Sequence, residues 1–153
     1  SLLSARAGAL ATRIGPRLPM TVGPLVAAVG VFHLSFADAG TQWVSGVLPG
    51  SLVFGLGMAL VVAPLTATVL GAAPAHLAGV ASGVNNAVAR AASLLVVAAL
   101  PVAVGLSGDD YAQPDVFTDG YALAMRLCAA LLALGGLIAW LTISADILAE
   151  DPS

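Results

Sequence analysis

Long apolar stretches alternate with short polar segments along the whole chain. The apolar stretches cover residues 1–10, 19–37, 44–70, 79–104 and 121–143. A helix of about 20 mainly apolar residues crosses the hydrocarbon core of a bilayer, which is about 30 Å thick. The pattern therefore predicts an all-α, polytopic membrane protein, a helical bundle of four full transmembrane helices with a truncated fifth at the N-terminus.

The two central stretches are the longest and carry the fewest charges. Residues 44–70 include no charged side chain, and residues 79–104 include only Arg90. A short Ala/Pro/His turn joins them, so we expect a transmembrane helical hairpin. Polar groups in such helices are costly unless they face protein or water, and we expect them to turn away from lipid.

Composition excludes several classes of protein. The chain is 59% hydrophobic and 8% charged, whereas soluble domains carry about 25% charged residues. Its net charge is −3, so it offers no basic surface for nucleic acid. Cys128 is the only cysteine, and His33 and His76 are far apart. We therefore expect no disulfide, no metal site and no cofactor, and we treat residues 1–153 as one domain whose tail covers 144–153.

One stretch carries a group of polar side chains on one side. In a helix over residues 79–104, Ser82, Asn86, Arg90 and Ser93 fall in a sector about 80° wide. These four residues are our candidates for lining a substrate cavity. Two alternatives stay open: Arg90 could snorkel to the membrane surface or hydrogen-bond a helix end, and Asn86 could bond a neighbouring helix.

Small residues recur at every fourth position of the stretch before it, and such rows let helix backbones approach closely in membranes. The candidates for packing and gating are Ser51, Gly55, Gly57, Ala59, Ala63, Pro64 and, in the following stretch, Gly83. Pro64 is expected to kink its helix.

Cation placement predicts the orientation of the chain in the membrane. Arg13 and Arg17 lie in the first loop, whereas the loop with Asp109 and Asp119 has no cation. Cytoplasmic loops are enriched in Lys and Arg. We expect the first loop and the C-terminus in the cytoplasm, the acidic loop outside, and the plasma (inner) membrane of a prokaryote as the location.

The order of these signals resembles the major facilitator superfamily, and within it the C-terminal part of the drug:proton antiporter branch with fourteen helices. The residues that carry the resemblance are Gly8, Arg13, Gly15 and Arg17 in the first loop, then Gly55, Gly57 and Pro64, and finally Ala81, Ser82, Gly83, Asn85, Asn86 and Arg90. The chain departs from the family pattern at Thr12, where the loop motif has Asp, and at Ala91 and Ala92, near a Gly-Gly of many relatives.

The resemblance implies proton-driven efflux of drugs or other small molecules by alternating access, and no enzymatic activity. The implied partners are the lipid bilayer, a small-molecule substrate, protons, and the preceding helices of the same transporter, because the chain is expected to be a fragment of a longer one. Two other functions remain open: a facilitator for another solute, and a membrane scaffold without a transport path. The scaffold alternative predicts tight packing around Ser82, Asn86 and Arg90.

Overall fold

A computed structural model of the chain describes residues 16–38, 40–71 and 73–143. It has four long helices, α2 (Arg17–Leu34), α3 (Leu48–Gly71), α4 (Ala78–Ala103) and α5 (Pro114–Thr142). Each of the four is long and apolar enough to cross a membrane. The predicted all-α membrane fold with four spanning helices is thus confirmed, and the truncated fifth helix expected at residues 1–10 lies outside the described residues.

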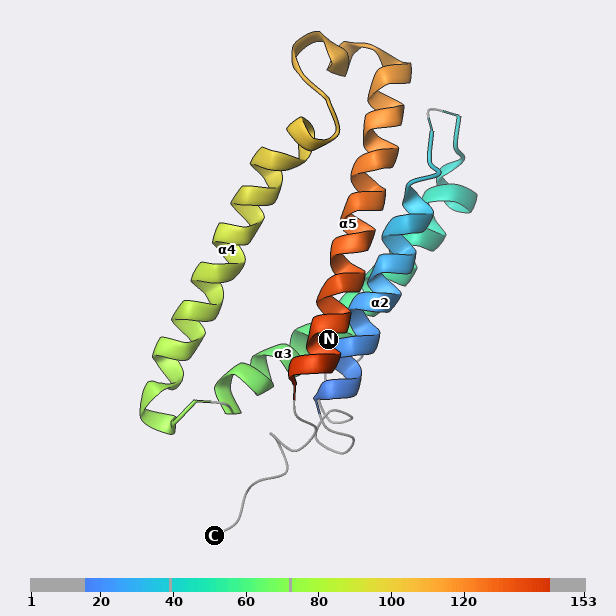
Figure 1. Cartoon of the computed structure of the whole chain (residues 1–153). Helices are drawn as coiled ribbons and strands as arrows, with labels where there is room; N and C mark the ends of the chain where they lie inside the picture. The colour runs from blue at the N-terminus through green and yellow to red at the C-terminus, as the bar shows by residue number, and fades with distance from the viewer. Residues whose placement is uncertain (1–15, 39, 72, 144–153) are drawn as a thin grey trace.

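Short helical turns complete the connections. A π-helical turn at Trp43–Val47 leads into α3, and 3₁₀ turns at Ala75–Leu77 and Gly108–Ala112 precede α4 and α5. Successive helices run in opposite directions, so the connections before α3 and before α5 lie at one end of the bundle, and the connection before α4 lies at the other (Figure 1). We call the end that holds the connections before α3 and α5 the acidic end. It carries Asp38, Asp109, Asp110, Asp115 and Asp119.

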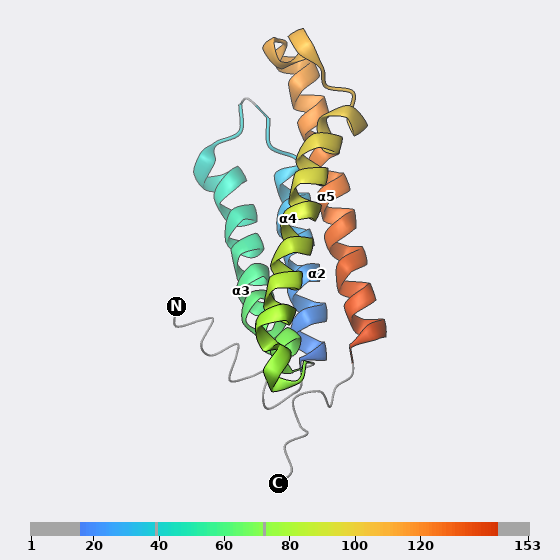
Figure 2. The ribbon, with the colours of Figure 1, turned by 90° about the vertical axis from the view of Figure 1, so that its left-hand side faces the viewer.

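The four helices are packed unevenly. Helix α2 packs closely against both α3 and α5, whereas α4 has few contacts with either of its chain neighbours. Figure 1 shows α4 leaning away from the other three, and Figure 2, viewed from that side, shows it in front of α2. No residue of α4 is buried. Among the described helices, α2 thus lies in the middle and packs against α3 and α5, and α4 lies at the side of these three.

Glycines bring α2 and α3 into backbone contact at two levels. A Cβ on Gly57 of α3 would lie 2.6 Å from the carbonyl oxygen of Gly23 and 2.8 Å from Cα of Ala27. One level further along, a Cβ on Gly30 of α2 would lie 2.7 Å from the carbonyl oxygen of Gly50. Only glycine fits at these distances, so these glycines set the close approach of the two helices.

Small residues also allow the contact between α2 and α5. Ala28 and Val31 of α2 and Ala129 of α5 form a buried apolar cluster. Near the other end of the interface, a Cβ on Gly136 would lie 3.0 Å from the carbonyl oxygen of Thr21. The helix pair is therefore held by close van der Waals packing, which is a main source of stability between helices in lipid.

The last helix begins at Pro114, earlier than the apolar stretch that starts at residue 121. Proline suits the first position of a helix because its missing N–H would have no partner there. Asp115 follows in the first turn, where a negative charge is favourable near the helix N-terminus. The polar start of α5 is consequently helical, although the hydrophobic pattern alone does not include it.

Candidate functional site

Three of the four cavity candidates on α4 are exposed. Asn86, Arg90 and Ser93 are exposed, and Ser82 is half-buried. The Asn86 side chain donates a hydrogen bond from Nδ2 to the Ser82 backbone oxygen at 3.1 Å. This bond lies within α4, so the structure gives Asn86 a partner on its own helix. The four residues, which we call the α4 polar stripe, keep the common side that the helical spacing predicts.

Arg90 lies at the middle of α4. It is the thirteenth residue of a helix that has 26 residues from Ala78 to Ala103, about 18 Å from the helix start at 1.5 Å per residue. The central position matters because it lengthens the distance that the guanidinium would have to cover to reach either membrane surface.

The packing and gating candidates on α3 have different surroundings. Gly57 meets the backbone of α2, and the ring of Pro64 is fully buried inside a helix that continues to Gly71. Within the part of the chain that the structure describes, a Cβ on Gly55 would meet nothing within 4 Å, and the same holds for Gly83 of α4. The α2–α3 contact therefore uses Gly50 and Gly57 and not the row through Gly55.

The remaining members of that row contribute little to the described packing. Ser51 is exposed and donates from Oγ to the Val47 oxygen at 2.9 Å, and Ala59 is half-buried. The side chain of Ala63 lies outside the described residues. The signal that could have identified the true contact is the seven-residue spacing of Gly50 and Gly57, which places both on one side of α3.

Arg17 links the first turn of α2 to the last turn of α5, which lie at the same end of the bundle. Its Nε donates to the Trp140 backbone oxygen at 2.9 Å, and its guanidinium carbon lies 4.1 Å from the centre of the Trp140 ring. The bond satisfies a carbonyl in the last turn of α5, where a cation is also favourable. The loop-motif residues Gly8, Arg13 and Gly15 lie outside the described residues. Sequence analysis did not identify Trp140 as the partner, because the two residues are 123 positions apart.

A hydrogen-bonded turn at the acidic end fixes a carboxylate. Asp38 accepts hydrogen bonds at Oδ1 from the Thr41 hydroxyl at 2.8 Å and from the Gly40 N–H at 2.9 Å. Both bonds favour the charged form, the Thr41 hydroxyl most, and they hold the pKa of Asp38 below its ordinary value. Asp38 therefore stays ionised at neutral pH. It lines an open hollow of about 340 Å³ together with Asp115 and Asp119 of α5.

The acids at this end do not form a recognisable metal centre. Among the residues that the structure describes, no group of three or more His, Cys, Asp or Glu side chains is placed to hold a metal ion. The hollow instead combines carboxylates with the Thr118 hydroxyl and the edge of Pro114. This arrangement suits a cation that keeps part of its own hydration or a cationic group of a larger molecule.

Comparison with known proteins finds relatives that confer drug resistance. The chain is 28% identical to the puromycin resistance protein pur8 of Streptomyces alboniger over 162 aligned positions, which cover 99% of this chain and 32% of that protein. It is 34% identical over 120 positions to a tetracenomycin C resistance and export protein of Streptomyces glaucescens, with 76% of this chain and 21% of that protein covered. It is also 34% identical over 87 positions to the multidrug resistance protein Stp of Mycobacterium tuberculosis, with 57% and 16% covered.

The chain covers a small part of each of these three relatives. No protein-family model matches the chain, and no solved structure matches it. The chain spans between 16% and 32% of the length of these three relatives. Together, the four membrane-length helices and these relatives identify the chain as a multi-pass membrane segment similar to drug-resistance and drug-export proteins.

Proposed function

We propose that the chain is the C-terminal part of a proton-coupled exporter of drugs or other small molecules, which works by alternating access in the plasma membrane. The relatives support export because one of them is an export protein and the other two also confer drug resistance. In this proposal the substrate path belongs to the complete protein, and the α4 polar stripe forms part of its wall. The missing helices of the same protein form the rest.

The exposed Arg90 in the middle of α4 carries this proposal. An arginine at the centre of a membrane helix costs about 2.5–3.5 kcal/mol on insertion scales. In the structure it lies on a helix that has few contacts with its neighbours and no buried residue. A water-filled cavity against this side of α4 would remove the cost, and it would also give the cation and Asn86 a substrate or ordered water to bind.

Proton coupling would come from other parts of the protein. The described helices α2, α3 and α4 contain no Asp or Glu, and in α5 the acids lie only near its start, at Asp115 and Asp119. A carrier that moves protons needs a titratable group along the path. We therefore assign the proton-binding carboxylates to preceding helices and give α4 a role in substrate binding and in the alternation between states.

The test is drug efflux by the complete protein in a bacterial host that lacks its own exporters. We expect the Arg90→Ala variant to lose efflux by about tenfold or more at equal membrane expression, because hydrogen bonds to charged groups are worth about 1.5–3 kcal/mol. The matched control is Val88→Ala, since Val88 is 63% exposed and points to the opposite side of α4. We expect this control to transport normally.

Three further results test the carrier proposal against its alternatives. A protonophore should abolish efflux by the wild-type protein if export is proton-driven. Unchanged efflux in Arg90→Ala would remove Arg90 from the mechanism. A well-expressed wild-type protein that transports none of the tested drugs would contradict the exporter proposal and favour a scaffold segment.

A further inference from the structure

An apolar groove runs along the α2–α5 pair and is lined by residues of these two helices alone. It has a volume of about 470 Å³. Its floor is formed by Ala28 and Ala129, which are buried, and its walls rise on both sides because the floor residues are small. The wall residues are Leu25, Val29 and Phe32 of α2 and Arg126, Ala130 and Ala133 of α5.

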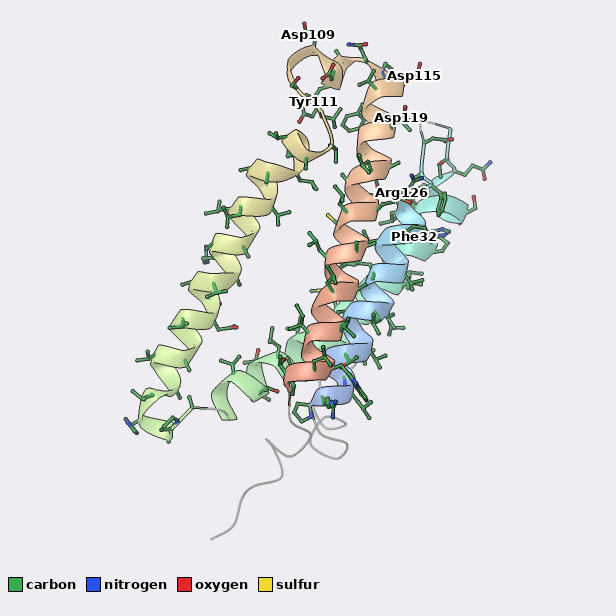
Figure 3. All side chains as sticks on the ribbon, viewed as in Figure 1. Phe32, Asp109, Tyr111, Asp115, Asp119 and Arg126 are labelled. Carbon is green, nitrogen blue, oxygen red and sulfur yellow. The ribbon has the colours of Figure 1, made fainter. Side chains whose placement is uncertain are left out.

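The groove has one cation, and it lies toward the acidic end. Since α2 and α5 are antiparallel, Phe32 and Arg126 lie at the same level, and Leu25 and Ala133 lie at the other end of the groove (Figure 3). The first and last residues of each wall are seven positions apart, which is about 10.5 Å along the helix. Half of a bilayer core is about 15 Å thick, so the groove matches most of the depth of one leaflet.

The direction of α5 places the guanidinium near the surface of that leaflet. Helical side chains tilt toward the helix N-terminus, and α5 begins at the acidic end. Arg126 is five residues, or about 7.5 Å, after Tyr121, an aromatic residue of the kind that is enriched at the membrane–water boundary. A long arginine side chain can span this distance, so its charge can reach the level of the lipid phosphates.

Carboxylates continue the same face of α5 beyond Arg126. Asp119 and Asp115 precede Arg126 by seven and eleven residues, so at 100° per residue all three lie within about 40° of one another. Figure 3 shows the three residues following one another along α5, with Phe32 of α2 beside Arg126. Asp115 and Asp119 line the hollow that also contains Asp38.

We propose that this surface binds one phospholipid with an amino head group, such as phosphatidylethanolamine, from the leaflet at the acidic end. An acyl chain fills the groove between α2 and α5, the phosphate pairs with Arg126, and the ammonium group extends outward to Asp119, Asp115 and Asp38. The order apolar, cationic, anionic along the protein matches the order acyl chain, phosphate, amine along the lipid. The charge of Asp38 at neutral pH supports the outer part of this arrangement.

A lipid suits the groove better than another helix does. A helix seated on α2 and α5 would remove Arg126 from the phosphate layer and bury its charge, which is costly without a carboxylate partner. An anionic head group without an amine would bring negative charge toward three carboxylates, and like charges repel. This lipid site does not depend on the proposed export function.

The experiment measures lipid retention by native mass spectrometry. The complete protein is purified, stripped of lipid and incubated with equal amounts of phosphatidylethanolamine and phosphatidylglycerol of the same chain length. We expect the wild type to retain one phosphatidylethanolamine preferentially, and Arg126→Gln to retain about tenfold less of it, because a charge-assisted bond is lost. Asp115→Asn combined with Asp119→Asn should lower the preference over phosphatidylglycerol.

Matched variants separate this site from other surfaces. Ala133→Leu narrows the groove and should reduce retention, whereas Ala99→Leu, which fills the apolar hollow between α4 and α5, should not. Asp109→Asn removes an acid at the same end but outside the α5 face and should keep the preference. Equal retention by wild type, Arg126→Gln and Ala133→Leu would overturn the proposal, and so would a wild type that retains no lipid or prefers phosphatidylglycerol.

Discussion

Arg17 has two roles: its charge favours one orientation in the membrane, and its side chain contacts Trp140. As a cation at the start of α2 it favours a cytoplasmic position for this helix end, and any lysine or arginine would do the same. In the structure it also bonds the Trp140 carbonyl and stacks on the Trp140 ring. Arginine has a planar guanidinium that can do both at once, whereas lysine is a point charge with different geometry. The second role is therefore specific to arginine.

We predict that Arg17→Lys keeps the membrane orientation and loses most of the contact with Trp140. Arg17→Ala should lower the stability of the α2–α5 pair by about 1–3 kcal/mol, from the lost hydrogen bond and the lost cation–π contact. The measurement is thermal unfolding in detergent, followed by Trp140 fluorescence in a background in which every other tryptophan, including Trp43, is replaced by Phe. Equal stability of Arg17→Lys and wild type would show that charge alone explains Arg17.

At the scale of the elements, the backbone contact between α2 and α3 depends on glycines at particular positions. Gly57 lies against Gly23 and Ala27, and two residues earlier Gly55 lies on a side of α3 that no described residue covers. Both glycines belong to the same glycine-rich segment, and their residue type gives no way to tell them apart. Their position around the helix does, because two residues differ by about 200°.

The expected result is that Gly57→Ala destabilises the protein by about 1–3 kcal/mol, because the added methyl group forces two backbones apart. Gly55→Ala is the matched control and should change the stability by about 0.5 kcal/mol or less. Thermal unfolding of both purified variants in detergent checks this difference. A larger loss for Gly55→Ala than for Gly57→Ala would mean that α3 uses its other side for its main contact.

At the scale of the whole molecule, the polar connections lie at two opposite ends, because the four described helices run in alternating directions. The connection that contains His76 lies at the end where α2 begins with Arg17, and Asp109 lies at the opposite end (Figures 1 and 3). A membrane would fit between these two ends. Since Arg17 favours the cytoplasm, the acidic end should face outward, and the amino phospholipid would then belong to the outer leaflet of this membrane.

Cysteine labelling of intact cells tests this orientation. In a Cys128→Ala background, Asp109→Cys should react with a membrane-impermeant maleimide added outside, and His76→Cys should react only after permeabilisation. The same background without an introduced cysteine is the control for labelling at other positions. Labelling of both positions from the same side would contradict the alternation of the helices, and the reverse pattern would contradict the orientation alone.

The sequence by itself determined the number, type and approximate place of the membrane helices, because transfer of about 20 residues into lipid is a sum over local composition. It also determined that Ser82, Asn86, Arg90 and Ser93 share one side of a helix, since that depends only on helical spacing. The predicted opening helix and the residues Gly8, Arg13 and Gly15 lie outside the described part of the chain, so they stay predictions.

Only the tertiary structure decided which helices touch and through which residues. Gly57 rather than Gly55 meets α2, Arg17 meets Trp140, α4 leans away, and Arg126 comes to lie beside Phe32. In lipid, helices associate through close packing and polar contacts and not through hydrophobic burial. The apolar pattern is therefore the same on packed and lipid-facing sides, and partners far apart in the chain leave no local signal in it.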